Sequence, residues 1–174
     1  MCSREVRETA YRAIVRPQLE YASSAWSPHT CKNIDSIEKV QKRAARFALG
    51  NYSYGPRNSI TSDITNILKW PTLHHRRISH DIHLMYKIIN RQVNVQLPSV
   101  CCFSHIHPGR FIHAQTLHSE AFKYSYFVRT VRFWNRLPLS LCNTTSFETF
   151  KSQASHFISS KSIARINNTW AIVD

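Results

Sequence analysis

The 174-residue chain carries 23 Lys plus Arg against 10 Asp plus Glu, a formal net charge of +13. Its length allows one compact domain or two small lobes, and a hydrophobic share of 43% excludes the composition of a disordered tail. No apolar run is long enough to span a membrane, and residues 1–12 lack the apolar core of a signal peptide. We therefore expect an intracellular protein, nuclear or cytoplasmic and not secreted, whose partner is a polyanion.

The positive charge is concentrated in the middle of the chain. Residues 39–136 contain 15 basic residues and three acidic ones, so they carry +12 of the net +13. The five cysteines are odd in number and irregularly spaced, which favours reduced thiols over a disulfide framework.

The first 28 residues predict two short helices. Ser3 can cap a helix over residues 3–16, and Pro17 interrupts the pattern and restarts it over residues 17–26. The expected apolar face of the first helix consists of Val6, Ala10 and Ile14, and the second is expected to bury Leu19, Ala22 and Trp26.

Residues 33–49 give the clearest helical pattern. Asn33 caps the predicted helix, Glu38 and Lys42 can pair at i,i+4, and Gly50 ends it. At roughly 100° per residue, one side collects an apolar stripe for packing: Ile34, Ile37, Val40, Ala44, Phe47 and Ala48. Nearly opposite lies a group that we call the basic stripe: Lys39, Lys42, Arg43 and Arg46.

A loop is predicted at 51–59, a short helix at 61–68 and a longer helix at 72–90 with Thr72 as its cap. The core positions expected in the longer helix are Ile78, Ile82, Met85, Ile88 and Ile89. Its first turns hold His74, His75, Arg76 and Arg77, where positive charge opposes the helix dipole. Either an anion binds there or the turn is simply solvated.

The remainder predicts an irregular connector at 93–121, an aromatic and basic segment at 122–134, a last helix and a frayed tail at 161–174. The aromatic segment is either extended or helical near 131–136. Ser146 begins the last helix, whose expected apolar face is Phe147, Phe150, Ala154 and Phe157. The expected fold is mainly α, a small irregular helical bundle with a possible short extended segment near 122–134, divided into a helical domain (1–92), the connector, a C-terminal segment (122–160) and the tail.

Residues for catalysis are missing. The acidic residues are scattered singly, so no carboxylate cluster for two-metal phosphoryl transfer exists, and no glycine-rich phosphate loop occurs. We expect no catalytic residue and no cofactor. The densest candidate for a metal site is the group Cys101, Cys102, His105 and His107, which lacks the paired spacing that zinc requires and is more typical of a polar loop.

Binding to nucleic acid is the chemistry that the sequence favours. The basic stripe can neutralise phosphates along one strand, Arg76 and Arg77 are further candidates, and Arg129 and Arg132 lie among aromatic rings. These rings either stack on bases or form the core: Tyr124, Tyr126, Phe127, Phe133 and Trp134. Nucleic acid is the favoured interpretation of the stripe, and core is the favoured interpretation of the rings.

Ordered strings along the chain carry a family resemblance. They are Ala10-Tyr11, IVRPQLEYASSAWSP at 14–28, IEKVQKRAARF at 37–47, LKWPTL at 68–73 followed by Arg76 and Arg77, MYKIIN at 85–90, and RTVRFWNRLP at 129–138 followed by FETFK at 147–151. Together they resemble the region after the catalytic palm in reverse transcriptases of LINE-type non-LTR retrotransposons. The resemblance covers residues 5–157.

This resemblance implies a thumb, a helical element beside the palm that contacts the template–primer duplex, followed by a C-terminal segment. The family's Tyr-x-Asp-Asp active-site motif lies upstream in such proteins and has no counterpart here. We therefore expect a catalysis-free C-terminal fragment of an RNA-directed DNA polymerase, and the start at Met1 suggests a reading frame from a truncated element. The expected partners are template–primer nucleic acid, bound without sequence preference, and an upstream palm, but no membrane.

Two other functions compete with this one. The chain could be a protein-interaction or structural module whose basic face contacts an acidic partner or the missing palm. It could also be a marginally stable polypeptide that exposes apolar surface.

Overall fold

The computed structural model describes residues 2–50, 67–99, 101–105, 109–112 and 119–160, and these are mainly helical as predicted. Over these residues the only β pairing is an isolated antiparallel bridge between Phe103 and Phe111, and no sheet forms. No helix in the same ranges has the length and hydropathy needed to cross a membrane. The chain divides into two units, 1–77 and 78–174.

The boundary between the units lies inside helix α6 (Leu73–Ile89). The reason is that α6 from Ile78 onward supplies core residues to the second unit, including Ile82 and Met85. The predicted start of α6 is confirmed, because the Thr72 hydroxyl oxygen accepts a hydrogen bond from the His75 amide at 3.1 Å.

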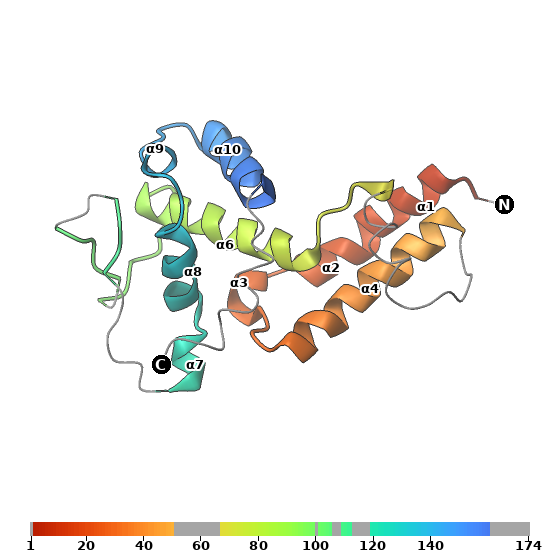
Figure 1. The fold of residues 1–174 in the computed structure, drawn as a ribbon, viewed down its shortest axis with the longest axis horizontal. Helices are drawn as coiled ribbons and strands as arrows, with labels where there is room; N and C mark the ends of the chain where they lie inside the picture. The colour runs from red at the N-terminus through yellow and green to blue at the C-terminus, as the bar shows by residue number, and fades with distance from the viewer. Residues whose placement is uncertain (1, 51–66, 100, 106–108, 113–118, 161–174) are drawn as a thin grey trace. The chain divides into compact units, whose positions relative to one another are not determined.

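The first unit begins with a helix that changes its winding without breaking. Helix α1 (Arg4–Ala10) leads into a π-helical stretch, η1 (Tyr11–Val15), and then into α2 (Arg16–Glu20). Figure 1 shows the helical ribbon continuing from α1 to α2. The predicted cap is confirmed, because the Ser3 side chain accepts from the Val6 amide. The predicted interruption at Pro17 is wrong, since proline in the first turn of α2 has no amide hydrogen to leave unpaired.

The apolar faces predicted for these helices are also wrong. Val6 is 56% exposed and Ile14 is 63% exposed, and the buried residue of this stretch is Tyr11. Ala22 has a left-handed backbone (φ 49°) that ends α2 and starts α3 (Ser23–Trp26), so Ala22 and Trp26 are exposed and Leu19 is half-buried.

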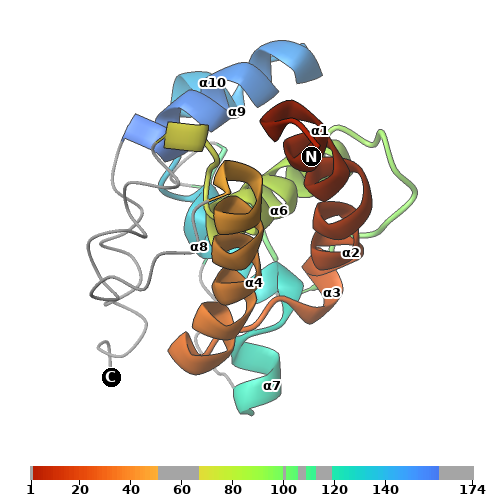
Figure 2. The same cartoon turned by 90° about the vertical axis from the view of Figure 1, so that its right-hand side faces the viewer.

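Helix α4 (Cys31–Leu49) runs beside α1 (Figure 2). Its cap lies three residues before the predicted one, because Thr30 and not Asn33 is the cap and accepts from the Asn33 amide at 3.4 Å. Its predicted end is confirmed, since Gly50 adopts φ 67°, a left-handed conformation that favours glycine. The small first core is Tyr11, Ala45, Ala48, Leu68 and Trp70, in which the Tyr11 and Trp70 rings stack at 4.6 Å.

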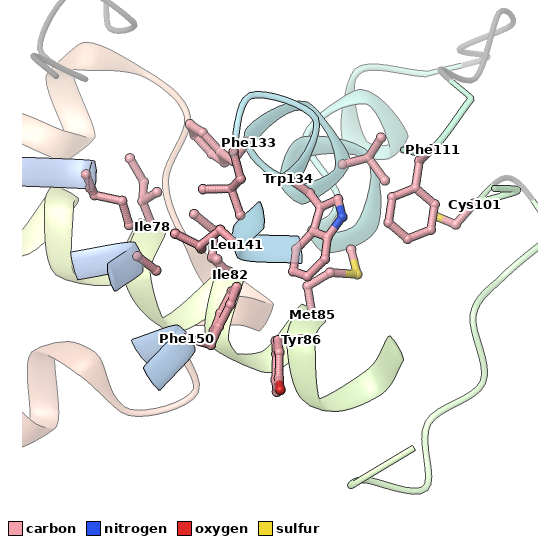
Figure 3. Packing of buried hydrophobic residues seen from close by; sticks show 14 residues of the cluster. Ile78, Ile82, Met85, Tyr86, Cys101, Phe111, Phe133, Trp134, Leu141 and Phe150 are labelled. Carbon is pink, nitrogen blue, oxygen red and sulfur yellow. The ribbon is translucent and has the colours of Figure 1, made fainter. Parts of the chain in front are cut away.

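The second unit has the larger core, formed by α6, α8 (Tyr126–Trp134) and α10 (Phe147–Ser160). Its rings pack closely: Tyr86 stacks on Phe150 at 4.2 Å, and Trp134 lies 5.8 Å from Phe150 (Figure 3). Phe150 and Ala154 are fully buried and Phe147 and Phe157 are half-buried, which confirms the predicted face of the last helix.

The aromatic segment is helical, so the extended alternative is wrong. It forms α7 (Glu120–Lys123) and α8, and a short helix α9 (Leu139–Cys142) follows. Phe133 and Trp134 are buried, which confirms the interpretation of these two rings as core, whereas Tyr124, Tyr126 and Phe127 are half-buried.

The described part of the connector is irregular, as predicted, and is fixed to the end of α8. The Asn135 side chain pairs with both backbone groups of Phe111 at 2.9 Å, and the Trp134 indole donates to the Gly109 carbonyl at 3.1 Å. The loop predicted at 51–59, most of the helix predicted at 61–68 and the tail at 161–174 lie outside the described residues.

Candidate nucleic-acid interface

The orientation of α4 is set by polar residues on its buried side. Gln41, 1% exposed, accepts a hydrogen bond from the Tyr11 hydroxyl at 3.1 Å and donates to the Pro71 carbonyl at 2.9 Å. Glu38 accepts from the backbone amides of Leu73 at 3.3 Å and His74 at 2.7 Å. The predicted Glu38–Lys42 pair is therefore replaced by a carboxylate cap on the first turn of α6.

The basic stripe lies on the other side of this helix. At roughly 100° per residue, its centre is nearly opposite the face formed by Gln41, Ala45 and Ala48. Lys39 and Arg43 are exposed, and Lys42 and Arg46 are half-buried. No carboxylate of the described residues forms an ion pair with any of the four, so their charges face solvent largely uncompensated.

Arg4 in α1 and Arg12 in η1 differ from the stripe in this respect. Glu8 accepts from Arg4 at 2.7 Å and from Arg12 at 3.3 Å, so a single carboxylate lies between two guanidinium groups. Exposed ion pairs of this kind contribute little to stability, but they reduce the net positive potential at the surface of α1. Among the described residues of the first unit, α4 thus carries the largest group of cations without a carboxylate partner.

At the start of α6, where the sequence left a bound anion and a solvated turn as alternatives, the protein supplies carboxylates of its own. In addition to the cap from Glu38, the Glu20 carboxylate receives two hydrogen bonds from the Arg76 guanidinium, one of them at 3.0 Å. This pairing raises the pKa of Arg76 further above its ordinary value. Arg77 is 0% exposed. The structure therefore does not favour a contact of Arg76 or Arg77 with nucleic acid, because Arg76 is engaged by Glu20 and Arg77 does not reach solvent.

Arg129 is a structural residue as well. Its guanidinium donates to the two carboxylate oxygens of Asp81 at 3.0 and 3.4 Å and to the Tyr124 carbonyl at 3.1 Å, all inside the second unit. Because a buried cation engaged in this way is held by its own fold, the structure does not favour a contact of Arg129 with a phosphate either. Arg132 is half-buried.

Two apolar residues assigned to packing lie on the surface instead. Val40 is 36% exposed and Phe47 is 47% exposed, since the buried face of α4 is rotated by about 60° from the predicted apolar stripe. Arg7 contacts Phe47 twice: its Nη1 donates to the Phe47 carbonyl at 2.8 Å, and its guanidinium carbon lies 5.8 Å from the ring centroid. Sequence patterning missed this contact, because the two residues lie 40 positions apart.

The described residues contain no group of three or more His, Cys, Asp or Glu side chains that could hold a metal ion. Within the cysteine and histidine cluster, Cys101 is buried and burial raises the pKa of its thiol to about 11, whereas Cys102 and His105 are exposed. His107 lies outside the described ranges.

Comparison with protein-family models, curated proteins and solved structures finds no match to the chain.

Proposed function

We propose that this chain is a catalysis-free helical module that binds the phosphate backbone of nucleic acid, without sequence preference, through the basic stripe of α4. The observation that carries the proposal is the asymmetry of this helix: Glu38 and Gln41 attach one side to the fold, and Lys39, Lys42, Arg43 and Arg46 are on the other side without a described carboxylate partner. Phosphate oxygens are the acceptors that such a row of cations fits.

The source that we propose for this module is the thumb and downstream region of a LINE-type reverse transcriptase. Its support is the ordered set of strings from residue 10 to residue 151, several of which fall on residues with structural roles. LKWPTL contains Trp70 of the first core, and RTVRFWNRLP contains Trp134 of the second. The parent enzyme would supply the palm and its carboxylates, and the setting would be intracellular.

The test is the salt dependence of binding to a DNA duplex. If the stripe neutralises about four phosphates, the slope of log K against log salt is about −3 to −4. Replacing Lys39 or Arg43 with alanine is expected to make that slope shallower by about one, with similar losses on unrelated sequences. Fluorescence anisotropy titrations at several salt concentrations measure both quantities.

Lys151→Ala provides the matched control. Lys151 is 52% exposed on α10 in the second unit, and its contact with Glu148 is 4.0 Å long, so its removal changes the charge equally without touching the stripe. A slope that is unchanged in the Lys39 and Arg43 variants, or changed equally in the control, would contradict the proposal.

One observation favours the competing function, a protein-interaction module. In the first unit several large apolar residues are exposed outside the stripe, among them Val6, Ile14 and Tyr21. Surfaces of this kind bind protein partners when they form a contiguous patch. Absence of any DNA, RNA or hybrid binding at low salt would favour this function over the first.

A further inference from the structure

We infer that the interface is selective for unpaired nucleotides, because the Phe47 ring at its edge stacks on an exposed base. This inference rests on the proposed function, since the basic stripe supplies the attraction to the backbone. To the proposed function it adds a preferred ligand class, single-stranded nucleic acid. It also adds a residue, Phe47, that distinguishes single strands from duplex.

The ring lies at the end of α4 where cations from two helices meet. Arg43 and Arg46 are one turn and one residue before Phe47 on the same helix, and Arg7 approaches from α1. Side chains three or four positions apart on a helix are separated by about 5–6 Å at Cβ, so a base on the ring places its phosphates within reach of Arg43.

The accessibility of the ring is built into the local backbone. Residue 50, one turn after Phe47, is glycine at φ 67°, and the space where a Cβ would lie is next to the Arg7 guanidinium at 3.2 Å. At Gly50 itself no side chain stands between the ring and solvent, and the atoms nearest to that space belong to the Arg7 guanidinium. With Arg7 at 5.8 Å from its centroid, the ring still has 47% of its residue's surface open to solvent.

The flanking chemistry fits a nucleobase better than a plain apolar partner. An apolar protein surface placed on Phe47 would have to bury the charges of Arg43 and Arg7 beside it, which costs free energy unless anions accompany it. A base in a nucleic acid strand comes with backbone phosphates, which supply the anions that these arginines need. Aromatic rings interleaved with cations are the usual platform for single strands, because every base has a face for stacking.

Selectivity follows from the geometry of the double helix. In a duplex both faces of each internal base are covered by its neighbours, so the ring has no face to contact. An unpaired base offers one without an unstacking cost. The cations contact backbone in both forms, and only the single strand gains the stacking contribution.

The experiment compares the affinity of the full chain for a 20-nucleotide single strand and for the same sequence as a blunt duplex, at one salt concentration. Phe47→Leu is expected to weaken binding to the single strand by roughly 5- to 150-fold, the range for loss of one stacked base, and to leave duplex affinity within about twofold. Phe47→Trp is expected to retain the preference. A 2-aminopurine base in the strand reports stacking directly, through quenching in the wild type that Phe47→Leu removes.

Tyr21→Leu is the matched control, since Tyr21 is an 81% exposed ring in the same unit but outside α4. Circular dichroism melts verify that each variant is folded. Single-strand and duplex affinities that are equal in the wild type, or a preference that persists in Phe47→Leu, would overturn this inference and leave the proposed function standing. Failure of the wild type to bind either ligand at low salt would overturn both.

Discussion

At the scale of single residues, acidic side chains decide which cations are free to bind. Glu38 covers the amides at the start of α6, Glu20 engages Arg76, and Asp81 engages Arg129. Each carboxylate removes a candidate anion site by occupying it. The stripe of α4 differs because no described carboxylate is within salt-bridge distance of it.

Glu38→Ala is expected to lower the free energy of unfolding by about 1–2 kcal/mol, because two amides at the positive end of α6 lose an acceptor and the carboxylate's charge. Urea denaturation followed by circular dichroism measures the change. Glu148→Ala is the control, since the Glu148 side chain is 79% exposed and its removal should change stability by less than about 0.5 kcal/mol. Equal effects of the two substitutions would show that the cap contributes nothing.

At the scale of elements, α10 packs on α6 through a histidine that resists protonation. His83 lies edge-on to Phe147 at 5.9 Å and to Phe150 at 6.2 Å. Burial lowers its pKa to about 4, and the neighbouring His80, Lys151 and Lys87 lower the pKa in the same direction. His80 and Lys87 act on the His83 ring from α6, and Lys151 acts on it from α10.

The contact between α6 and α10 is expected to weaken in acid. An unfolded His83 takes up its proton near pH 6.5, whereas the folded one does so only near pH 4, so the unfolded state binds more protons between these values. Stability is therefore complete above about pH 6.5 and decreases as the pH falls toward 4. Urea midpoints at pH 7 and pH 4.5 measure the loss.

His83→Leu tests the assignment, because leucine can pack against the two phenylalanines without titrating. The variant is expected to lose less stability between the two pH values than the wild type. Part of the loss of stability between pH 7 and pH 4.5 is expected to remain in this variant, because other groups also titrate. One of them is His75, whose pKa is lowered by burial and by Arg76. An unchanged pH dependence in His83→Leu would assign the effect to those groups instead.

The positions of the main helices and the buried faces of α6 and α10 could be predicted from local signals, whereas the buried faces of the first helical stretch and of α4 could not. Gly50 and Thr72 mark boundaries through interactions within a few residues. The buried side of α4 depends on Gln41, whose partners Tyr11 and Pro71 are each 30 positions away. A pattern of hydrophobic residues does not detect a buried polar residue with such partners. The pattern therefore predicted that Val40 and Phe47 lie on the buried face of α4.

The candidate site was predictable to a similar degree. The exposure of Lys39 and Arg43 follows from helical periodicity alone. Arg76 and Arg129 could not be assigned in this way, because their carboxylate partners lie 56 and 48 positions away in the chain. Only tertiary structure shows whether a cation binds a ligand or its own fold.

At the scale of the whole molecule, a net charge of +13 attracts any polyanion, so binding alone does not locate an interface. Two double variants separate a local site from general attraction. Lys39→Gln with Arg43→Gln and Arg136→Gln with Lys151→Gln each remove two exposed cations, lowering +13 to +11.

The first pair is expected to weaken single-strand binding by at least about tenfold at 0.1 M salt, because two phosphate contacts are lost. The second pair, in the other unit, is expected to change affinity by less than about threefold. Filter-binding or anisotropy titrations measure both. Comparable losses in the two variants would mean that the total charge, and not α4, controls the affinity.

The π-helical stretch η1 has a consequence for detecting relatives of this chain. A π-turn is equivalent to one inserted residue in an otherwise regular helix. A homologue that lacks the insertion would keep an ordinary helix here, and its alignment with this chain would require a one-residue gap between Ala10 and Arg16. Scoring schemes penalise gaps inside helices, so shared ancestry before and after this point would be recovered as two short matches and not as one long match.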